Sequence, residues 1–198
     1  MKKNWNLIKW ISLIVIFGFM MGCVSFPVKP SESNFKVPTV SLSHVEVEHY
    51  WGYWYFTDKA KPVKGEAGVY GAPLDLAFIF EIENPNSYPV LMESLKFTVG
   101  FEQFDLNTGG SSEAMWIPAG KTNEIRVHAM FDAHTARLSL LVASGFKVKE
   151  TGKSPWDLLE KWWTGAPEFS FPVNVSEGAA VFKAGGVTKV AGFKATFP

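Results

Sequence analysis

The segment Leu74–Glu83 alternates apolar and polar residues for ten positions, and this pattern limits most strongly what the chain can fold into. Its apolar positions are Leu74, Leu76, Phe78, Phe80 and Ile82. Successive side chains of a strand point to opposite faces of a sheet, so the alternation predicts a strand with one buried face. Only Ala77 and Ile79 interrupt the polar face. Asn84-Pro85-Asn86 follows and predicts a turn, because proline removes a ladder donor.

Similar alternation recurs along the chain and predicts about seven or eight strands. The other predicted strands cover residues 37–50, 91–102, 115–117, 124–131, 169–175, 179–183 and 187–197. The first of these changes phase near Ser43, which indicates a β-bulge. Predicted turns lie at Asn107–Gly110, at Pro118–Lys121 and at Gly185-Gly186. Many short strands separated by turns are typical of an antiparallel β-sandwich.

Two short helices are predicted within this mainly β chain. The first covers residues 133–144, with Asp132 as N-cap and Gly145 at its end. The second begins with Ser154 as cap and Pro155 in the first turn, and Gly165 ends it. Its apolar stripe consists of Leu158, Leu159, Trp162 and Trp163.

The first 23 residues are typical of a secreted protein. Lys2, Lys3 and Lys9 precede or interrupt a short apolar segment that ends in Met20-Met21-Gly22-Cys23. These four residues are similar to the lipobox of bacterial lipoproteins. The resemblance implies that residues 1–22 are a signal peptide cleaved between Gly22 and Cys23, and that Cys23 is acylated.

The alternative is an uncleaved membrane helix. The apolar run from Trp10 to Met21 has 12 residues, whereas a spanning helix needs roughly 20, so we prefer the lipoprotein interpretation. Val24 rather than an aspartate follows Cys23, which in a host with two membranes implies an outer-membrane anchor facing the periplasm. Residues 23–36 contain two prolines and three serines without periodicity, and we expect them to form a flexible tether.

Charge and cysteine content exclude several classes of function for residues 23–198. The first 22 residues hold three of the 19 basic residues and none of the 19 acidic ones, which leaves 16 basic and 19 acidic residues and a net charge of −3. No basic field is therefore available for nucleic acid. Cys23 is the only cysteine, so its acylation would exclude disulfides, thiol catalysis and cysteine-based zinc sites.

Three motifs in fixed order resemble the late-embryogenesis-abundant type 2 family, also called the water-stress and hypersensitive-response domain. They are the strand ending in Asn84-Pro85-Asn86, then Tyr88-Pro89, then Ile117-Pro118-Ala119-Gly120. The resemblance implies a fibronectin-III/immunoglobulin-like β-sandwich over residues 37–198. It also implies a non-enzymatic role in desiccation or stress tolerance, with no cofactor and no catalytic residue. Asn84, Pro85 and Asn86 would then be a fold-determining turn.

The densest aromatic cluster, residues 50–56, is the best candidate binding surface. Trp51, Tyr53, Trp54 and Tyr55 belong to it. Exposed aromatic side chains can stack on a glycan or lie at a lipid interface. The alternative, which we prefer, is that these rings pack in the core beneath the tryptophan-rich helix.

Catalytic and metal sites have weaker support. His44, Glu46 and Glu48 share one strand face, but neighbours on such a face are about 7 Å apart, and a solvated polar face explains them better than a metal does. Glu81 and Glu83 also share a face, which would suit a hydrolase only inside a cleft. We therefore predict a lipid-anchored, non-catalytic envelope protein related to stress or acting as a binding module. The alternative is an accessory subunit of an envelope complex that contacts a protein or glycan through its aromatic residues.

Overall fold

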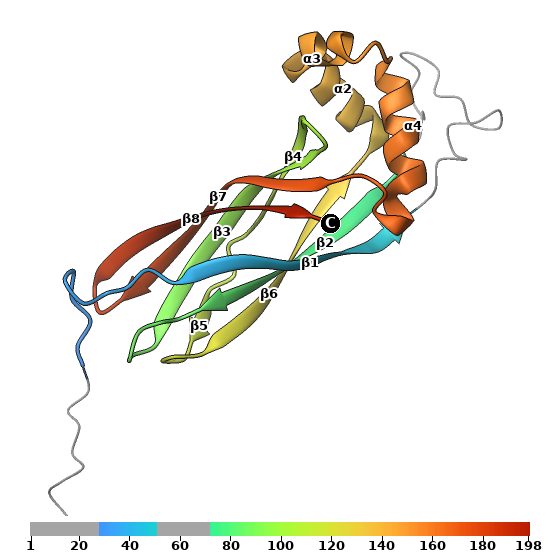
Figure 1. The fold of residues 1–198 in the computed structure, drawn as a ribbon. Helices are drawn as coiled ribbons and strands as arrows, with labels where there is room; N and C mark the ends of the chain where they lie inside the picture. Colours follow the sequence, from blue (N-terminus) through green and yellow to red (C-terminus); the bar gives the residue numbers. More distant parts are fainter. Residues whose placement is uncertain (1–27, 51–71) are drawn as a thin grey trace, which may run out of the picture.

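The computed structural model describes residues 28–50 and 72–198, which form two antiparallel sheets and a group of short helices (Figure 1). The first sheet has three strands in the order β1-β2-β6. Their bounds are β1 (Thr39–Tyr50), β2 (Leu74–Glu83) and β6 (Thr122–Phe131). The bounds of β2 are those predicted from its alternation. The predicted bulge is also present, because the pairing of β1 with β2 shifts between Leu42 and His44.

The second sheet has the strand order β4-β3-β7-β8, with a short strand β5 also paired to β3. The strands are β3 (Val90–Phe101), β4 (Phe104–Ser111), β5 (Met115–Ile117), β7 (Val173–Ala184) and β8 (Val187–Phe197). The sheets meet face to face through aromatic rings, since Phe97 lies 5.1 Å from Phe78 and 5.0 Å from Phe80 between ring centroids. The predicted mainly β, antiparallel sandwich is therefore confirmed.

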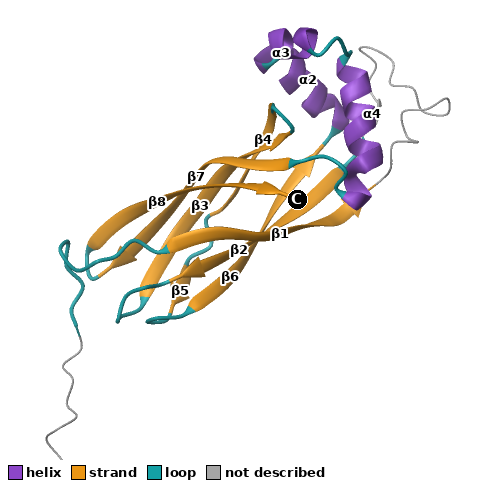
Figure 2. Cartoon of the chain, viewed as in Figure 1, coloured by secondary structure: helices purple, strands orange, loops and turns teal. Residues whose placement is uncertain are grey.

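Three short α-helices lie together at one end of the sandwich (Figure 2). They are α2 (Ala133–Ala143), α3 (Gly145–Glu150) and α4 (Pro155–Gly165), and a 3₁₀ turn, η2 (Ala166–Glu168), follows. We expected about two helices with Gly145 as an end. Instead Ser144 interrupts the helical path with φ of −132° and Gly145 begins α3. In the described ranges no helix combines the length and the apolar character needed to cross a membrane.

The helix α4 closes this end of the core. Its predicted punctuation is present, since Ser154 and Asp157 form a capping box. Trp162 and Trp163 are both 0% exposed. The ring of Trp162 lies 5.6 Å from Phe101, and Nε1 of Trp163 donates a hydrogen bond of 2.7 Å to the carbonyl of Ala72. The apolar stripe of α4 therefore belongs to the core and is not available to a partner.

The turn predicted at Asn107–Gly110 is wrong, because these residues belong to β4. The chain turns earlier, at Glu102 and Gln103, where Glu102 has φ of +53°. Gly109 is needed for packing: a Cβ there would lie 2.7 Å from Cζ of Phe97. The other two predicted turns are present, since Gly120, Gly185 and Gly186 all have positive φ.

The predicted tether extends too far into the domain. Phe35 is buried and its ring packs against Tyr88, and Pro30 lies against the turn at Gly185. Lys189 on β8 donates to the carbonyl of Glu32. The packed domain therefore begins near Pro30, earlier than the expected boundary at residue 37.

Candidate functional site

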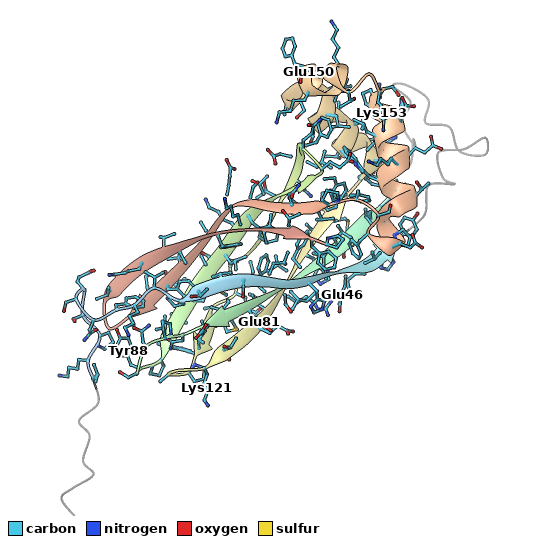
Figure 3. All side chains as sticks on the ribbon, in the orientation of Figure 1. Glu46, Glu81, Tyr88, Lys121, Glu150 and Lys153 are labelled. Carbon is cyan, nitrogen blue, oxygen red and sulfur yellow. The ribbon has the colours of Figure 1, made fainter. Side chains whose placement is uncertain are left out.

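The motif Asn84-Pro85-Asn86 lies at the end of the sandwich opposite the helices, close to Tyr88 and Lys121 (Figure 3). Asn84 is completely buried. Its side-chain nitrogen donates to three backbone carbonyls: Tyr88 at 2.9 Å, Ile117 at 3.1 Å and Pro118 at 3.1 Å. One amide thus joins the loop after β2 to the turn after β5.

Asn86 extends this network to the N-terminal segment. Its backbone N–H and its side-chain nitrogen both donate to Oδ1 of Asn84, at 3.0 and 2.9 Å. The same side chain accepts from the N–H of Lys36 at 2.8 Å and donates to the carbonyl of Lys36 at 2.7 Å. These contacts are structural, because the polar atoms of Asn84 are used within the fold and none faces a cleft.

The aromatic candidates Trp51, Tyr53, Trp54 and Tyr55 lie outside the described residues, as do Gly22 and Cys23. Tyr50 is the first member of the cluster and the only one described. Its hydroxyl donates to the carbonyl of Trp163 on α4. The end of β1 is thereby attached to the helix that closes the core.

The polar face of β1 and β6 carries a row of ion pairs. Nη2 of Arg126 lies 2.7 Å from Oε2 of Glu46, and a second nitrogen of Arg126 contacts Glu48. His44 lies 3.1 Å from the other oxygen of Glu46. The hydrogen bond from Arg126 is the main cause of the lowered pKa of Glu46. Arginine thus occupies the carboxylates that we considered as metal ligands, and within residues 28–50 and 72–198 no three His, Cys, Asp or Glu side chains converge.

Other titratable residues, among them the candidates Glu81 and Glu83, also lie on open sheet surface. His128 is 3.0 Å from Asp75 across the β2–β6 pair. Glu81 and Glu83 are exposed on β2, and neither lines a depression described below. The sheets therefore offer no cleft with paired carboxylates in the described part of the chain.

The outer face of α2 and α3 is the feature that we did not predict from the sequence. Leu138 is 59% exposed, Leu141 46%, Val142 84% and Phe146 89%. The opposite face is also apolar, with Ala136, Leu140 and Val148 buried against the domain. A helix that covers a core needs one apolar side only. The sequence signal that could have revealed this exposed face is a second group of apolar residues, at positions 138, 141, 142 and 146, beside the group that is buried.

A shallow depression of about 440 Å³ lies between α2 and β4 beside these side chains. Leu138 and Val142 line it from α2, and Leu106 and Thr108 line it from β4. Ser139 holds the two elements together by donating to the carbonyl of Leu106 at 3.2 Å. The exposed apolar face therefore continues from the helices toward the sheet.

We call residues 133–153, with α2, α3 and the connection to α4, the helical tip. It contains four basic residues, Arg137, Lys147, Lys149 and Lys153, and one acidic residue, Glu150. Its net charge is therefore +3, in a chain whose residues 23–198 carry −3. Apolar exposure and positive charge occur at the same end of the molecule.

No protein-family model matches the chain, and no curated protein matches it. Among solved structures, a crystal structure of a protein from Archaeoglobus fulgidus is similar. The two share 10% sequence identity over 79% of this chain and 94% of that chain, with a TM-score of 0.41. We draw neither fold nor function from a likeness at this level.

Proposed function

We propose that the chain is a lipid-anchored, non-catalytic protein of the bacterial cell envelope that acts as a rigid binding module. The observation that carries the anchor is the sequence Met20-Met21-Gly22-Cys23 after a basic and apolar segment. Attachment through several acyl chains would be stable, whereas one chain binds a membrane only marginally. In a host with two membranes, Val24 supports an outer-membrane location that faces the periplasm.

The second part of the proposal is that the domain binds a partner through its surface and does not catalyse a reaction. Its support is the exposed apolar face of the helical tip, since contiguous apolar side chains on a soluble domain usually mark an interaction site. The ordered motifs around Asn84 additionally support membership of the late-embryogenesis-abundant type 2 family and a fibronectin-III-like arrangement of the two sheets. Under that resemblance the module serves desiccation or stress tolerance.

The second candidate function is an accessory subunit of an envelope complex. The exposed helical tip favours an accessory subunit. The contact surface would differ from the aromatic one that we expected, because Trp162 and Trp163 are buried. A complex would then form through Leu138, Val142 and Phe146 and not through the tryptophans of α4.

The test compares cells that express the wild-type chain with cells that express Cys23→Ala. We expect the wild-type protein in the membrane fraction, with an N-terminal mass of acylated Cys23, and we expect the variant to lose both properties. A wild-type protein that retains residues 1–22 without lipid would contradict the anchor. Stoichiometric co-purification of another envelope protein, lost in Phe146→Ser, would favour the accessory subunit.

A further inference from the structure

We propose that the helical tip docks on an anionic lipid bilayer through Leu138, Leu141, Val142 and Phe146. The bilayer would be the partner that the exposed surface of the tip binds in the proposed function. This inference rests on that function only for the anchor, which would keep the tip close to a membrane.

Leu138, Leu141 and Val142 follow the spacing i, i+3 and i+4, so they share one face of α2. Phe146 follows on α3, after the break at Ser144, and we call these four exposed side chains the stripe. Phe146 is the most exposed large apolar residue in the described chain. The face of a helix that contacts only water normally carries polar residues. The apolar residues at these four positions therefore indicate contact with an apolar partner.

Three lysines of the helical tip supply positive charge that complements anionic headgroups, although Asp105 lies beside Leu138 and Val142 in the depression. Lys147 and Lys149 lie one and three residues after Phe146 and are exposed, and Lys153 is exposed just before α4. Figure 3 shows Lys153 and Glu150 at the helical end of the molecule. Each lysine near an anionic membrane surface strengthens binding. Two copies of the tip, each with a net charge of +3, would repel each other, which argues against self-association.

The composition favours lipid over a protein partner. Protein interfaces are enriched in aromatic residues, methionine and arginine and depleted in lysine. The stripe has a single aromatic residue, Phe146, among leucine and valine, and lysines lie near it. Such a face suits an interfacial helix, whose apolar residues enter the bilayer boundary while lysine stems extend their charged groups to the headgroups.

The fold places the helical tip and Val28, the first described residue, at opposite ends of the sandwich (Figure 1). The 12 residues of β3 span about 40 Å, and residues 23–29 reach at most about 25 Å. Docking on the bilayer that holds Cys23 would therefore lay the sandwich along the membrane. The anchor makes this contact intramolecular, so a weak stripe is sufficient.

The experiment uses the mature, acylated protein in vesicles of phosphatidylcholine, with or without phosphatidylglycerol. Acylation of Cys23 leaves no other thiol, so a new cysteine can carry an environment-sensitive fluorophore. Val142→Cys reports on the tip, and Val190→Cys on β8 is the matched control because Val190 is also exposed, at 58%. We expect a blue shift and quenching by lipid-embedded quenchers at position 142 in the anionic vesicles, with no change at position 190.

Further variants separate the apolar and electrostatic contributions. Phe146→Ser should weaken partitioning of the tip about tenfold, and Trp116→Ser, at another exposed aromatic residue, should have no effect. Lys147→Gln with Lys149→Gln should weaken it about 25-fold, or fivefold per lysine, while Lys96→Gln with Lys194→Gln should not. Added salt should weaken binding further by screening.

Three outcomes would overturn the proposal. The label at position 142 could remain in a water-like environment in both kinds of vesicle, which would leave an acidic protein partner as the alternative. Its blue shift could grow with protein concentration without lipid, which would indicate a second copy. It could also be equal in neutral and anionic vesicles and insensitive to the lysine substitutions.

Failure of the anchor would be visible separately. The mass of the N-terminal peptide from the same preparation shows whether Cys23 is acylated. If it is not, the proposed lipid anchor fails, and flotation of the unmodified chain with the same vesicles still tests the tip through Phe146→Ser and the lysine variants.

Discussion

Replacing Asn84 by alanine should be among the most destabilising single changes in this fold. The amide of Asn84 has two N–H groups, shared among the carbonyls of Tyr88, Ile117 and Pro118, and its oxygen accepts two N–H groups of Asn86. Alanine removes two donated and two accepted hydrogen bonds at a site with no exposed surface. At about 1 kcal/mol each, the loss is about 4 kcal/mol.

This value is large compared with the stability of a typical domain, about 5–15 kcal/mol. Urea denaturation followed by tryptophan fluorescence would measure it, because Trp162 and Trp163 become exposed on unfolding. In a thermal scan the same loss should lower Tm by about 8–16 °C for a domain of this size. The m-value should not change if the native state keeps its compactness.

Two controls determine whether burial of the Asn84 amide is the cause. Asn86→Ala should cost only about 1–2 kcal/mol, because its hydrogen bonds with the backbone of Lys36 are part-buried and Lys36 is an exposed residue, so water can partly replace them. Asn123→Ala removes a similar amide contact, a 2.9 Å hydrogen bond to Trp116, from an exposed site, and should change stability by less than about 0.5 kcal/mol. A cost for Asn84→Ala below about 1.5 kcal/mol, or no larger than that for Asn86→Ala, would refute the reasoning.

Three further predictions concern the core and its helical end. Partial burial tends to raise the pKa of Glu102, but hydrogen bonds from Lys161 and Trp162 outweigh it and the net pKa is lowered. The stabilisation of the folded state by ionised Glu102 is therefore present above its unfolded pKa of about 4.3. It is lost as pH falls below that value. Denaturation at several pH values should show this loss in the wild type and not in Glu102→Gln, and equal acid sensitivity would contradict it. Gly109→Ala should cost about 1–3 kcal/mol by pushing the ring of Phe97, while Gly145→Ala, which meets nothing within 4 Å, should be neutral or stabilising; the idea fails if the two variants are equally stable. Trp163→Phe should lose about 2 kcal/mol by leaving the carbonyl of Ala72 without its donor, whereas Trp116→Phe on the surface should not; calorimetry that finds equal Tm values would rule this out.

Local pattern predicted the strands where one face of a sheet is core and the other is water. The alternation in β2 predicted its bounds, and the paired glycines at 185 and 186 predicted the β7–β8 turn. Ile79 shows a limit of the method, because it is buried on the polar face of β2. It pairs with His44 and lies opposite Arg126, so neighbouring strands determine its burial and its own position in the sequence does not.

The errors arose where one residue type can serve two purposes. The glycines at 109 and 110 resemble a turn, but the first makes room for a ring from the neighbouring strand. Phe35 lies within a proline- and serine-containing segment, yet it packs on Tyr88, 53 positions later in the chain. Tertiary contacts of this kind have no local signature.

The candidate site was the least predictable part. Exposure of Leu138, Val142 and Phe146 depends on which side of α2 and α3 meets the sandwich, and a helix with apolar residues on both faces does not specify that side. The capping of α4 by Ser154, in contrast, was predictable because the cap and its partner Asp157 are three residues apart.

The attachment of Lys36 to Asn86 also has a mechanical consequence. In a chain held at Cys23, a pull on the domain reaches β1 through Lys36 and runs along the strand toward the helical end. The antiparallel pairing of β1 with β2, from Thr39 opposite Glu83 to Tyr50 opposite Leu74, would then be loaded in shear, so its hydrogen bonds share the force and do not break one after another. We expect single-molecule pulling from the N-terminus against the tip to show one high rupture force, and a lower force in Asn86→Ala, where the load reaches β1 without the clamp on Lys36.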